Sequence, residues 1–255
     1  MTTEAQNPIK SVETAFRILE EVRNMDGARG ADIASVLDMP PSTLHNYLST
    51  LQQEGYLVKE DEEYTLGLRF IYFGDYAKHR LKLYRIAKRN IDELAEQTGE
   101  MANLLVEENG LGIYVAVSRS ERALRLESYV QEREHLHCTA VGKAILAYLN
   151  DDRLLQIVEQ HGLPQMTENT ITTPERLHTE LETVHERGIA FDREERLNGL
   201  QCCAAPILEN GVPLGAVSVS GPKSRMQGQV FDQEVPQMVR DTANAIEIDL
   251  VHSTQ

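Results

Sequence analysis

The clearest structural signal lies in residues 39–51, which read Met39-Pro-Pro-Ser-Thr-Leu-His-Asn-Tyr-Leu-Ser-Thr-Leu51. Proline is tolerated in the first turn of a helix, so Pro41 indicates that a helix begins here. Three leucines recur at helical spacing and predict one buried face: Leu44, Leu48 and Leu51. Four small polar residues fall together on the opposite face: Ser42, His45, Asn46 and Ser49.

The sequence on either side, from residue 8 to residue 69, predicts two more helices and a hairpin. An earlier helix places five apolar residues on one buried face: Val12, Ala15, Phe16, Leu19 and Val22. A short second helix does the same with Ile33, Val36 and Leu37. The β-type runs 56–58 and 64–66 flank an acidic turn at 60–63, which predicts a hairpin. This order of elements is that of a winged helix-turn-helix.

The charge of the chain argues at first against a nucleic-acid partner. Its 255 residues include 40 acidic and 25 basic side chains, for a formal charge of −15. Yet no acidic residue occurs between Met39 and Gln53. Serine and threonine can donate hydrogen bonds to phosphates, and asparagine can bond adenine through two hydrogen bonds. We therefore expect the third helix to contact DNA, the alternative being an ordinary solvated helix face.

The basic residues are eighteen arginines and only seven lysines. An acidic excess with little lysine is typical of proteins that work in concentrated salt, where the Debye length falls to roughly 3 Å at 1 M. The alternative is an acidic protein from an ordinary cytosol. Residues 8–67 hold five basic and eleven acidic side chains, a net charge of −6. We expect DNA binding to weaken less than usual with rising salt, or even to strengthen.

Other sequence features point to a cytoplasmic protein. Three cysteines (Cys138, Cys202 and Cys203) are too few for a disulfide framework, and an odd number fits a reducing compartment. No apolar run approaches the roughly 18 residues that a membrane span requires. The N-terminus has no signal-peptide pattern. We expect no membrane partner, no cofactor and no resident metal.

The remainder of the chain has a mixed pattern. Residues 70–100 predict one long helix or two helices in tandem, a connector that we expect to contact a second copy. This region is basic, through Lys78, Arg80, Lys82, Arg85, Lys88 and Arg89. Strand-like runs occupy residues 101–107, 112–119, 124–129, 201–208 and 213–220. Helical patterns occupy 141–149, 151–161, 174–187 and 231–251. This order predicts an α+β domain in which helices pack on an antiparallel sheet.

Several motifs, in order and at characteristic spacing, make residues 9–250 resemble the IclR family of transcriptional regulators. In the N-terminal part they are Ser11-Val-Glu-Thr-Ala-Phe-Arg-Ile-Leu19, Pro41-Ser-Thr-Leu-His45, Leu51-Gln-Gln-Glu-Gly-Tyr-Leu57 and Tyr64-Thr-Leu-Gly-Leu-Arg69. In the C-terminal part they are Thr139-Ala-Val-Gly-Lys-Ala144, Arg187-Gly-Ile-Ala-Phe-Asp-Arg-Glu-Glu195, Gly199-Leu-Gln-Cys-Cys-Ala-Ala-Pro206 and Ser218-Val-Ser-Gly-Pro222. The chain departs from the family at Pro41 and Asn46, where members often carry Lys or Arg. It also departs in the wing, which is the predicted hairpin with the acidic turn at residues 60–63.

The resemblance implies a winged helix-turn-helix over residues 1–69, a linker helix over 70–90 and a GAF-like or profilin-like effector domain over 91–255. It implies a homodimer or dimer of dimers, a palindromic double-stranded operator, a small-molecule effector and no enzymatic activity. We assign DNA contacts to Arg29, Ser42, Thr43, His45, Asn46 and Ser49. The resemblance assigns effector contacts to Ala140, Val141, Gly142, Asp192, Leu200, Cys202, Ser218 and Ser220.

These effector positions also make chemical sense. Residues 141–144 open a helix, whose free N–H groups favour an anion, and Gly142 would let a ligand approach the backbone. Ser218 and Ser220 lie on one side of a strand, and Asp192 can accept a hydrogen bond from a ligand hydroxyl. We expect a small carboxylate or a hydroxy acid, or more broadly a sugar-derived effector. Alternatively, the serines satisfy local backbone groups and Asp192 pairs with Arg187 or Arg193.

Three other functions compete with this interpretation. His135, His137 and Cys138 could bind a metal together with Cys202 or Cys203, although the spacing is not that of a standard zinc motif and adjacent cysteines in a strand face opposite sides. Cys202 or Ser218 could be a nucleophile with His137 as its base, which would make a hydrolase. A sensing module that acts only through protein partners is the third alternative, and the acidic wing favours it.

Overall fold

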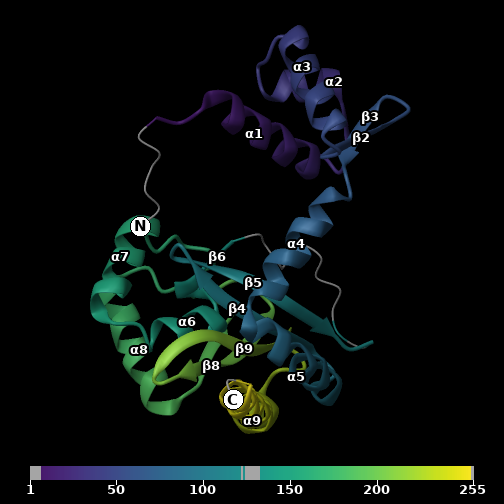
Figure 1. Ribbon diagram of the computed structural model, residues 1–255. Helices are drawn as coiled ribbons and strands as arrows, with labels where there is room; N and C mark the ends of the chain where they lie inside the picture. Colours follow the sequence, from purple (N-terminus) through teal and green to yellow (C-terminus); the bar gives the residue numbers. More distant parts are fainter. Residues whose placement is uncertain (1–6, 122, 124–132, 254–255) are drawn as a thin grey trace. The chain divides into compact units, whose positions relative to one another are not determined.

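The computed structural model describes residues 7–121, 123 and 133–253 (Figure 1). It divides the chain into two compact units, Met1–Arg80 and Leu81–Gln255. The strand expected at 124–129 lies outside the described residues. Otherwise, both units contain the predicted kinds of element.

The N-terminal unit combines helices with a small antiparallel sheet. Its elements are α1 (Lys10–Asn24), β1 (Ala28–Arg29), α2 (Gly30–Val36), α3 (Pro41–Gln53), β2 (Leu57–Glu60), β3 (Glu63–Leu66) and α4 (Arg69–Arg80). The predicted hairpin is confirmed as β2 and β3, and β1 adds to it in the order β1-β3-β2. Sequence analysis missed β1, because a strand of two residues has no periodicity to detect. The unit is a winged helix-turn-helix.

The core of this unit confirms the predicted stripe of α3 but corrects that of α1. Leu44, Leu48 and Leu51 are buried, and they share a core with Ile18, Leu19 and Val22. In contrast, Val12 and Phe16 remain 48% and 60% exposed, so their predicted burial was wrong. Val36 of α2, at 57% exposed, was also wrongly placed in the core. Helical spacing indicates which residues share a face, but not how far a neighbouring element covers it.

The C-terminal unit is a single antiparallel sheet with helices on both faces. Its elements are α5 (Lys82–Thr98), β4 (Met101–Glu108), β5 (Leu111–Arg119), β6 (Glu134–His135), a 3-10 turn (Leu136–Cys138), α6 (Ala140–Leu146), α7 (Asp151–His161), α8 (Pro174–Arg187), β7 (Ala190–Arg193), β8 (Leu200–Glu209), β9 (Val212–Pro222), a π-helical turn (Val230–Glu234) and α9 (Val235–His252). The strand order is β6-β5-β4-β9-β8-β7. This confirms the α+β class, whereas the short strands β6 and β7 were not predicted.

Alternating side chains give this sheet two different cores. Ala102 and Leu104 of β4, with Val217 and Val219 of β9, pack among residues of α5 and α9. On the other face, Met101, Leu105 and Cys202 pack among residues of α6, α7 and α8. Helical residues 70–100 form two helices in tandem, the second of the two predicted arrangements, and α5 belongs to the first of these cores. Among the described helices, none combines the length and the apolar character needed to cross a bilayer.

Candidate DNA-binding and effector-binding sites

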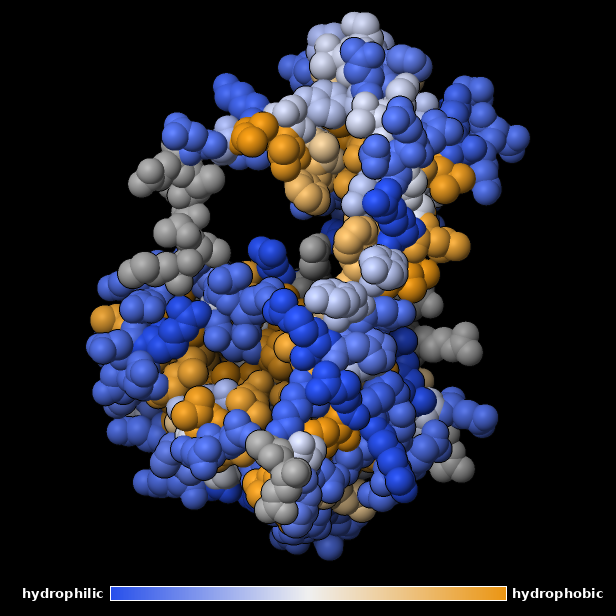
Figure 2. All heavy atoms as spheres, viewed as in Figure 1, coloured by the Kyte–Doolittle hydropathy of each residue, from blue (hydrophilic) through white to orange (hydrophobic). Residues whose placement is uncertain are grey.

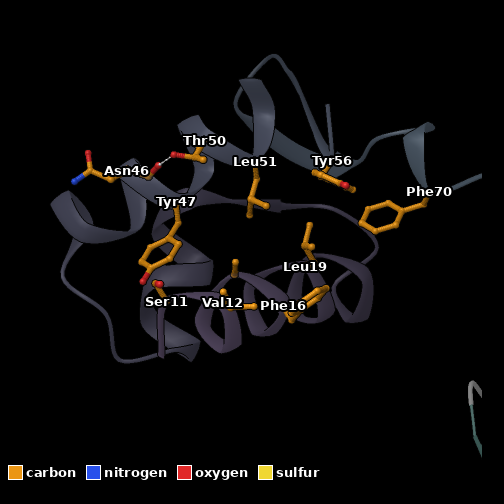
Figure 3. A pocket seen from close by; sticks show the side chains of 11 residues that line it. Ser11, Val12, Phe16, Leu19, Asn46, Tyr47, Thr50, Leu51, Tyr56 and Phe70 are labelled. Atoms are coloured by element: carbon orange, nitrogen blue, oxygen red, sulfur yellow. Dashed lines mark hydrogen bonds between the residues drawn. The ribbon is translucent and has the colours of Figure 1, made fainter. Parts of the chain in front are cut away.

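The solvent face of α3 carries the residues expected to contact DNA. Five of them are exposed, as the sequence predicted: Ser42, Thr43, His45, Asn46 and Ser49. His45 and Ser49 are hydrogen-bonded across one turn at 3.5 Å, and Thr50 Oγ1 donates to the Asn46 carbonyl oxygen at 2.8 Å. Figure 3 shows the Asn46 amide group directed away from the apolar side chains below it. The face therefore presents uncharged donors and acceptors to solvent.

The wing, the hairpin of β2 and β3, carries acidic residues, and Arg29 of β1 lies next to one of them. Arg29 lies in β1, and its Nε is 3.9 Å from Glu63 of β3, with both side chains more than half exposed. Exposed ion pairs of this kind contribute little stability, so Arg29 can exchange Glu63 for a phosphate at small cost. The wing turn itself, Glu60 to Glu63, is exposed, and Lys59 lies 3.4 Å from Glu62.

An apolar groove of about 510 Å³ opens between α1 and α3. Val12, Phe16 and Leu19 of α1 line one side, and Figure 3 shows Tyr47 and Leu51 of α3 on the other. Val12 and Phe16, the two α1 residues wrongly assigned to the core, are therefore groove residues. In Figure 2 hydrophobic side chains of this unit reach the surface in orange.

Helix α4 has an apolar surface but no buried residue. Ile71, Tyr72 and Tyr76 are 57%, 72% and 65% exposed. At its start, the Arg69 guanidinium lies 4.9 Å from the centre of the Tyr56 ring, and it also donates to the Glu54 carbonyl oxygen. The beginning of α4 is thus fixed to the winged helix-turn-helix, while Ile71, Tyr72 and Tyr76 face outward.

In the C-terminal unit, the expected effector residues gather on the α6 side of the sheet. Asn103 Nδ2 donates to Ser218 Oγ and to Ser220 Oγ, each at 3.2 Å, and all three residues are buried. In the sheet register Ser220 lies opposite Cys202, and Cys202 lies opposite Asp192. The serines therefore bond to a side chain of the next strand, and the alternative in which they satisfy local backbone groups was wrong.

Helix α6 covers this face at the expected positions, but Gly142 has a different role from the one predicted. Ala140 and Val141 are buried in the same core as Cys202 and Leu200. A Cβ on Gly142 would lie 2.1 Å from the Leu136 carbonyl oxygen. Glycine is therefore required so that α6 can pack on the preceding 3-10 turn, whose backbone fills the space that a ligand was expected to use. The Gly142 N–H donates to Thr139 Oγ1 at 3.0 Å, which weakens the expected anion site.

Asp192 uses one of its two carboxylate oxygens to hold the turn after β7. Its Oδ1 accepts from the backbone N–H groups of Glu195 at 2.7 Å and Arg196 at 3.4 Å. The alternative pairing with Arg187 or Arg193 was wrong, since Arg193 instead pairs with Asp232 at 3.1 Å. Burial, reinforced by the Glu195 carboxylate, raises the pKa of Asp192 to about 7.

Buried ion pairs surround this turn, and sequence analysis did not anticipate them. Lys143 of α6 is 1% exposed, and its Nζ contacts Glu180 of α8 at 2.9 Å and Glu195 at 2.6 Å. Burial would lower the pKa of Lys143, but the two carboxylates raise it. Arg196 pairs with buried Glu134 of β6 at 2.8 Å. These contacts join positions between 37 and 62 residues apart, so no local pattern could reveal them.

Asn103 was also missed, although the sequence contains a signal for it. It is a single polar residue in the apolar run Met101-Ala-Asn-Leu-Leu-Val106, in a strand that we predicted. A polar side chain in a buried strand requires partners. The partners turn out to be Ser218 and Ser220, two residues that the motif analysis had already selected.

The histidines and cysteines do not form the metal site considered above. The ring of His135 lies 5.8 Å from that of His137 and 6.4 Å from that of His161, measured between centres. Cys138 Sγ donates to the His135 carbonyl oxygen, and burial raises the pKa of this thiol to about 12. Across residues 7–121, 123 and 133–253, no three His, Cys, Asp or Glu side chains are grouped so as to hold a metal ion. Cys202 and Cys203 face opposite sides of the sheet, as expected.

The hydrolase alternative also lacks its geometry. His137 Nε2 donates to the Pro164 carbonyl oxygen at 3.1 Å, and burial lowers the pKa of His137 to about 4. A histidine with so low a pKa is a weak general base at neutral pH. Ser218 Oγ meanwhile accepts a hydrogen bond from Asn103.

Comparisons with known proteins agree with this architecture. Residues 11–61 match the IclR helix-turn-helix domain, and residues 75–248 match the C-terminal domain of the bacterial transcriptional regulator IclR. The chain is 34% identical over 247 residues to a probable HTH-type transcriptional regulator, ArcR, of Halobacterium salinarum, covering 95% of this chain and 94% of that protein. It is 31% identical to the regulator KdgR of Escherichia coli, covering 93% and 91% of the two chains.

A solved structure extends the agreement to three dimensions. The crystal structure of Thermotoga maritima IclR superimposes with a TM-score of 0.80 at 30% identity, covering 94% of this chain and 98% of that one. The haloarchaeal source of ArcR agrees with the acidic, arginine-rich composition of this chain, which is typical of halophilic proteins. Both domains, their order and their folds are therefore those of a known class of non-enzymatic regulators, and the chain belongs to the IclR family of transcriptional regulators.

Proposed function

We propose that this protein is a homodimeric cytoplasmic regulator that binds a palindromic operator and responds to a small organic effector, an acid or a sugar derivative. Residues 1–69 would bind the operator, residues 70–90 would link, and residues 91–255 would bind the effector. The observation that carries the proposal is the exposed, acid-free polar face of α3 in a chain that otherwise has 40 acidic residues.

The face of α3 suits direct reading of bases. Asn46 can bond an adenine edge through two hydrogen bonds, and Ser42 and Ser49 can donate to bases or phosphates. Arg29 at the edge of the wing is positioned to add a phosphate contact. Because the surrounding domain is acidic, we infer that contacts with base edges carry more of the affinity than phosphate contacts do.

An electrophoretic shift on the chain's own promoter region, performed in molar KCl, tests this assignment. Replacing both Asn46 and Ser49 by Ala should weaken binding by about 30-fold or more, since each lost base contact costs roughly 1–3 kcal/mol. Exchange of two exposed threonines of α8, Thr179 and Thr183, for Ala serves as the matched control and should leave the shift unchanged.

The same experiment distinguishes a DNA-binding regulator from a module that acts only through protein partners. Unaltered binding by the Asn46→Ala, Ser49→Ala protein would place recognition on another surface. If the parent protein shifts neither its own promoter nor a genomic fragment library, the helix-turn-helix does not bind DNA. The acidic wing would then favour a module that acts through protein partners.

The polar residues between the sheet and α6 support an effector site in the C-terminal unit. Asp192, Ser218 and Ser220 are buried there, and Ala140 and Val141 cover the same face. An IclR homologue from Microbacterium hydrocarbonoxydans, 22% identical with a TM-score of 0.76, was crystallised with 4-hydroxybenzoate. A small organic ligand in this domain is therefore the effector that we propose, bound by the positions assigned from the family motifs other than Gly142, whose space the Leu136 backbone fills.

A thermal-shift screen of organic acids and sugar derivatives in molar KCl tests for the effector. A ligand that binds only the folded protein at about 100 times its dissociation constant should contribute ~2.7 kcal/mol to stability. Addition of such a ligand should also change the operator affinity measured in the electrophoretic shift. A ligand that stabilises the protein but leaves operator binding unchanged would contradict a regulatory role for the site.

The apolar surfaces of the N-terminal unit support the homodimer. Ile71, Tyr72 and Tyr76 of α4 are exposed, and the groove beside α1 is lined by Val12 and Phe16. Exposed apolar surface of this kind is typical of interaction sites, and a two-fold dimer uses the same surface of both copies.

A further inference from the structure

The turn that follows α3 and the turn that leads into α4 are held together by their backbones. Residues 54–56 follow α3, and residues 67–69 lead into α4. The Gly67 N–H donates to the Tyr56 carbonyl oxygen at 2.8 Å. A Cβ on Gly67 would clash with the Gly55 carbonyl oxygen, so the two turns approach as closely as a glycine permits. The end of α3 therefore lies directly against the start of α4.

Arg69, the first residue of α4, adds a side-chain contact across this junction. Its guanidinium donates to the carbonyl oxygen of Glu54, the residue that caps the C-terminal end of α3, and lies 3.7 Å from the Glu54 carboxylate. The same guanidinium lies 4.9 Å from the centre of the Tyr56 ring and 6.0 Å from that of Phe73. We call Arg69, with Glu54 and Tyr56, the α3–α4 clamp.

Aromatic side chains of α4 reinforce the clamp. Phe70 and Phe73, which are neighbours on the helix surface, both pack on Tyr56, with ring centres 5.2 Å and 6.2 Å from it. The rings of Phe73 and Tyr56 are nearly parallel, at 16°, and Figure 3 shows Tyr56 and Phe70 side by side. Planar groups stacked in this way restrict orientation as well as distance. These contacts therefore fix the direction in which α4 leaves the winged helix-turn-helix.

A phosphate contact is the alternative role for Arg69. Its side chain is 46% exposed, and exposed arginines often bind phosphates. The guanidinium is already engaged, however, because it hydrogen-bonds one of the carbonyl oxygens that a helix end leaves without an intrahelical partner. A phosphate would have to replace that bond and the contact with the Tyr56 ring. The observed geometry therefore favours a role within the protein.

The direction of α4 matters in the proposed homodimer. Its exposed Ile71, Tyr72 and Tyr76 belong to the surface that we assigned to the second copy. A two-fold dimer presents its two copies of α3 to half-sites that lie one turn of DNA apart, or a multiple of it. A rotation of α3 relative to α4 would therefore change the half-site spacing that the dimer fits.

We propose that Arg69 is a positioning residue for operator binding. The α3–α4 clamp makes the orientation of α3 follow that of α4, and it thereby sets the half-site spacing that the homodimer accepts. The inference rests on the proposed function as a homodimeric, operator-binding regulator, and specifies how each copy of α3 is held in place.

Fluorescence anisotropy with the full-length protein in molar KCl tests the clamp. The first probe is the fragment of the chain's own promoter that the parent protein protects in footprinting. The second holds a single half-site, and the third has two base pairs inserted between the half-sites. The parent should prefer the intact fragment to the single half-site by about 100-fold or more, as expected for two linked contacts. The insertion rotates one half-site by roughly 70° and should weaken parent binding about tenfold or more.

Arg69→Lys and Arg69→Gln should lose most of this selectivity. The preference for the intact fragment and the penalty of the insertion should each fall about fivefold or more, whereas affinity for the single half-site should change less than about threefold. Lysine keeps the charge but lacks the planar group that contacts the Tyr56 ring and Glu54 together. Phe73→Ala weakens the clamp from the α4 side and should act in the same direction, so the test stands if the Arg69 variants fail to fold. Arg176→Gln, at an exposed position of α8, is the control for the loss of one positive charge and should bind all three probes as the parent does.

Several results would overturn the proposal while the proposed function stands. Equal losses on the intact and half-site fragments in Arg69→Gln, restored in Arg69→Lys, would make Arg69 a phosphate contact. A lower melting temperature with unchanged selectivity would make the clamp purely structural. Variants that sediment as monomers would show that Arg69 holds the dimer together instead, and a parent protein without preference for the intact fragment would leave no spacing to set. If the parent binds none of its promoter fragments, the proposed function fails and the role of Arg69 falls with it.

Discussion

Asp192 combines a structural role with an unusual proton affinity. One oxygen holds the turn after β7 through two backbone N–H groups, and the other has no partner among the described residues. Burial raises its pKa to about 7, so at neutral pH the carboxyl group is close to the midpoint of its titration. The neighbouring Glu195 also has a raised pKa, mainly because of burial.

Replacing Asp192 by Asn should change how stability depends on pH. The folded pKa of about 7 exceeds the ordinary value of 3.8, so the stability that the carboxyl group contributes is fully present below about pH 4. It is lost as the pH rises through 7. Between pH 5 and pH 8, the melting temperature of the parent should therefore fall relative to that of the variant. Equal pH profiles for the two proteins would show that Asp192 titrates normally.

Gly142 gives a second prediction at this scale. A Cβ there would lie 2.1 Å from the Leu136 carbonyl oxygen, so α6 or the preceding turn would have to move. Gly142→Ala should lower the free energy of unfolding by about 1–3 kcal/mol or more in urea denaturation. Gly74→Ala in α4 is the matched control, because a Cβ there meets nothing within 4 Å. Alanine at this helical position should be neutral or stabilising.

Helix α4 exposes several large apolar side chains. Apart from Phe70 and Phe73, which contact Tyr56, this 12-residue helix has little packing within the described residues, and isolated helices of this length are marginal in water. The helix would be stabilised if another surface covered its exposed Ile71, Tyr72 and Tyr76. The pairing of two copies supplies that surface in the proposed homodimer.

Substitution of Ile71 and Tyr76 by Glu should therefore weaken the dimer. Each change removes apolar area from the contact and would bury a charge there, which is costly without a partner. Sedimentation velocity in molar KCl should show a shift towards the monomer over micromolar concentrations. Leu155→Glu, a similarly exposed position on α7, is the control and should leave the distribution unchanged. Dimers of undiminished stability would place the contact elsewhere.

Sequence patterns identified most elements, and the reasons for the exceptions are physical. The leucines of α3, the wing hairpin and the paired serines of β9 follow from spacing alone, since periods of 3.6 and 2 residues are properties of the local backbone. Strand β1 and the exposure of Phe16 depend on neighbours that are distant in sequence. The same holds for Lys143, whose carboxylate partners lie 37 and 52 residues away. Motif resemblance selected Asp192 and both serines, but not Asn103, which donates hydrogen bonds to the two serines.

At the scale of the whole molecule, the dominant property is the charge of −15. Conventional regulators lose affinity for DNA as salt rises, by about 0.9 in log K per contacted phosphate for each unit of log salt. A DNA-binding domain with a net charge of −6 has few phosphate contacts to lose. Screening also reduces the repulsion between this domain and the DNA backbone.

We therefore expect operator affinity to depend weakly on KCl between 0.5 and 3 M, or to increase with it. Fluorescence anisotropy with a labelled promoter fragment measures this directly. Neutralising the wing by Glu60→Gln and Glu62→Gln should raise the affinity in low salt and have little effect in molar salt. A steep loss of binding in the parent protein, of the size found for basic regulators, would contradict this expectation.

The two-faced sheet of the C-terminal unit has a consequence for how the protein communicates. Asn103 and Ser218 lie on the face of the sheet assigned to the effector, while the residues next to them in β4 and β9 pack among those of α5, which follows directly after α4 in the chain. Only the backbone of these two strands then separates the proposed ligand from the core that contains α5. Ligand binding would then change the operator affinity through movements of β4 and β9, rather than through a chain of side-chain contacts. Substitutions under α5 should accordingly yield proteins that bind ligand and operator separately but no longer link the two events.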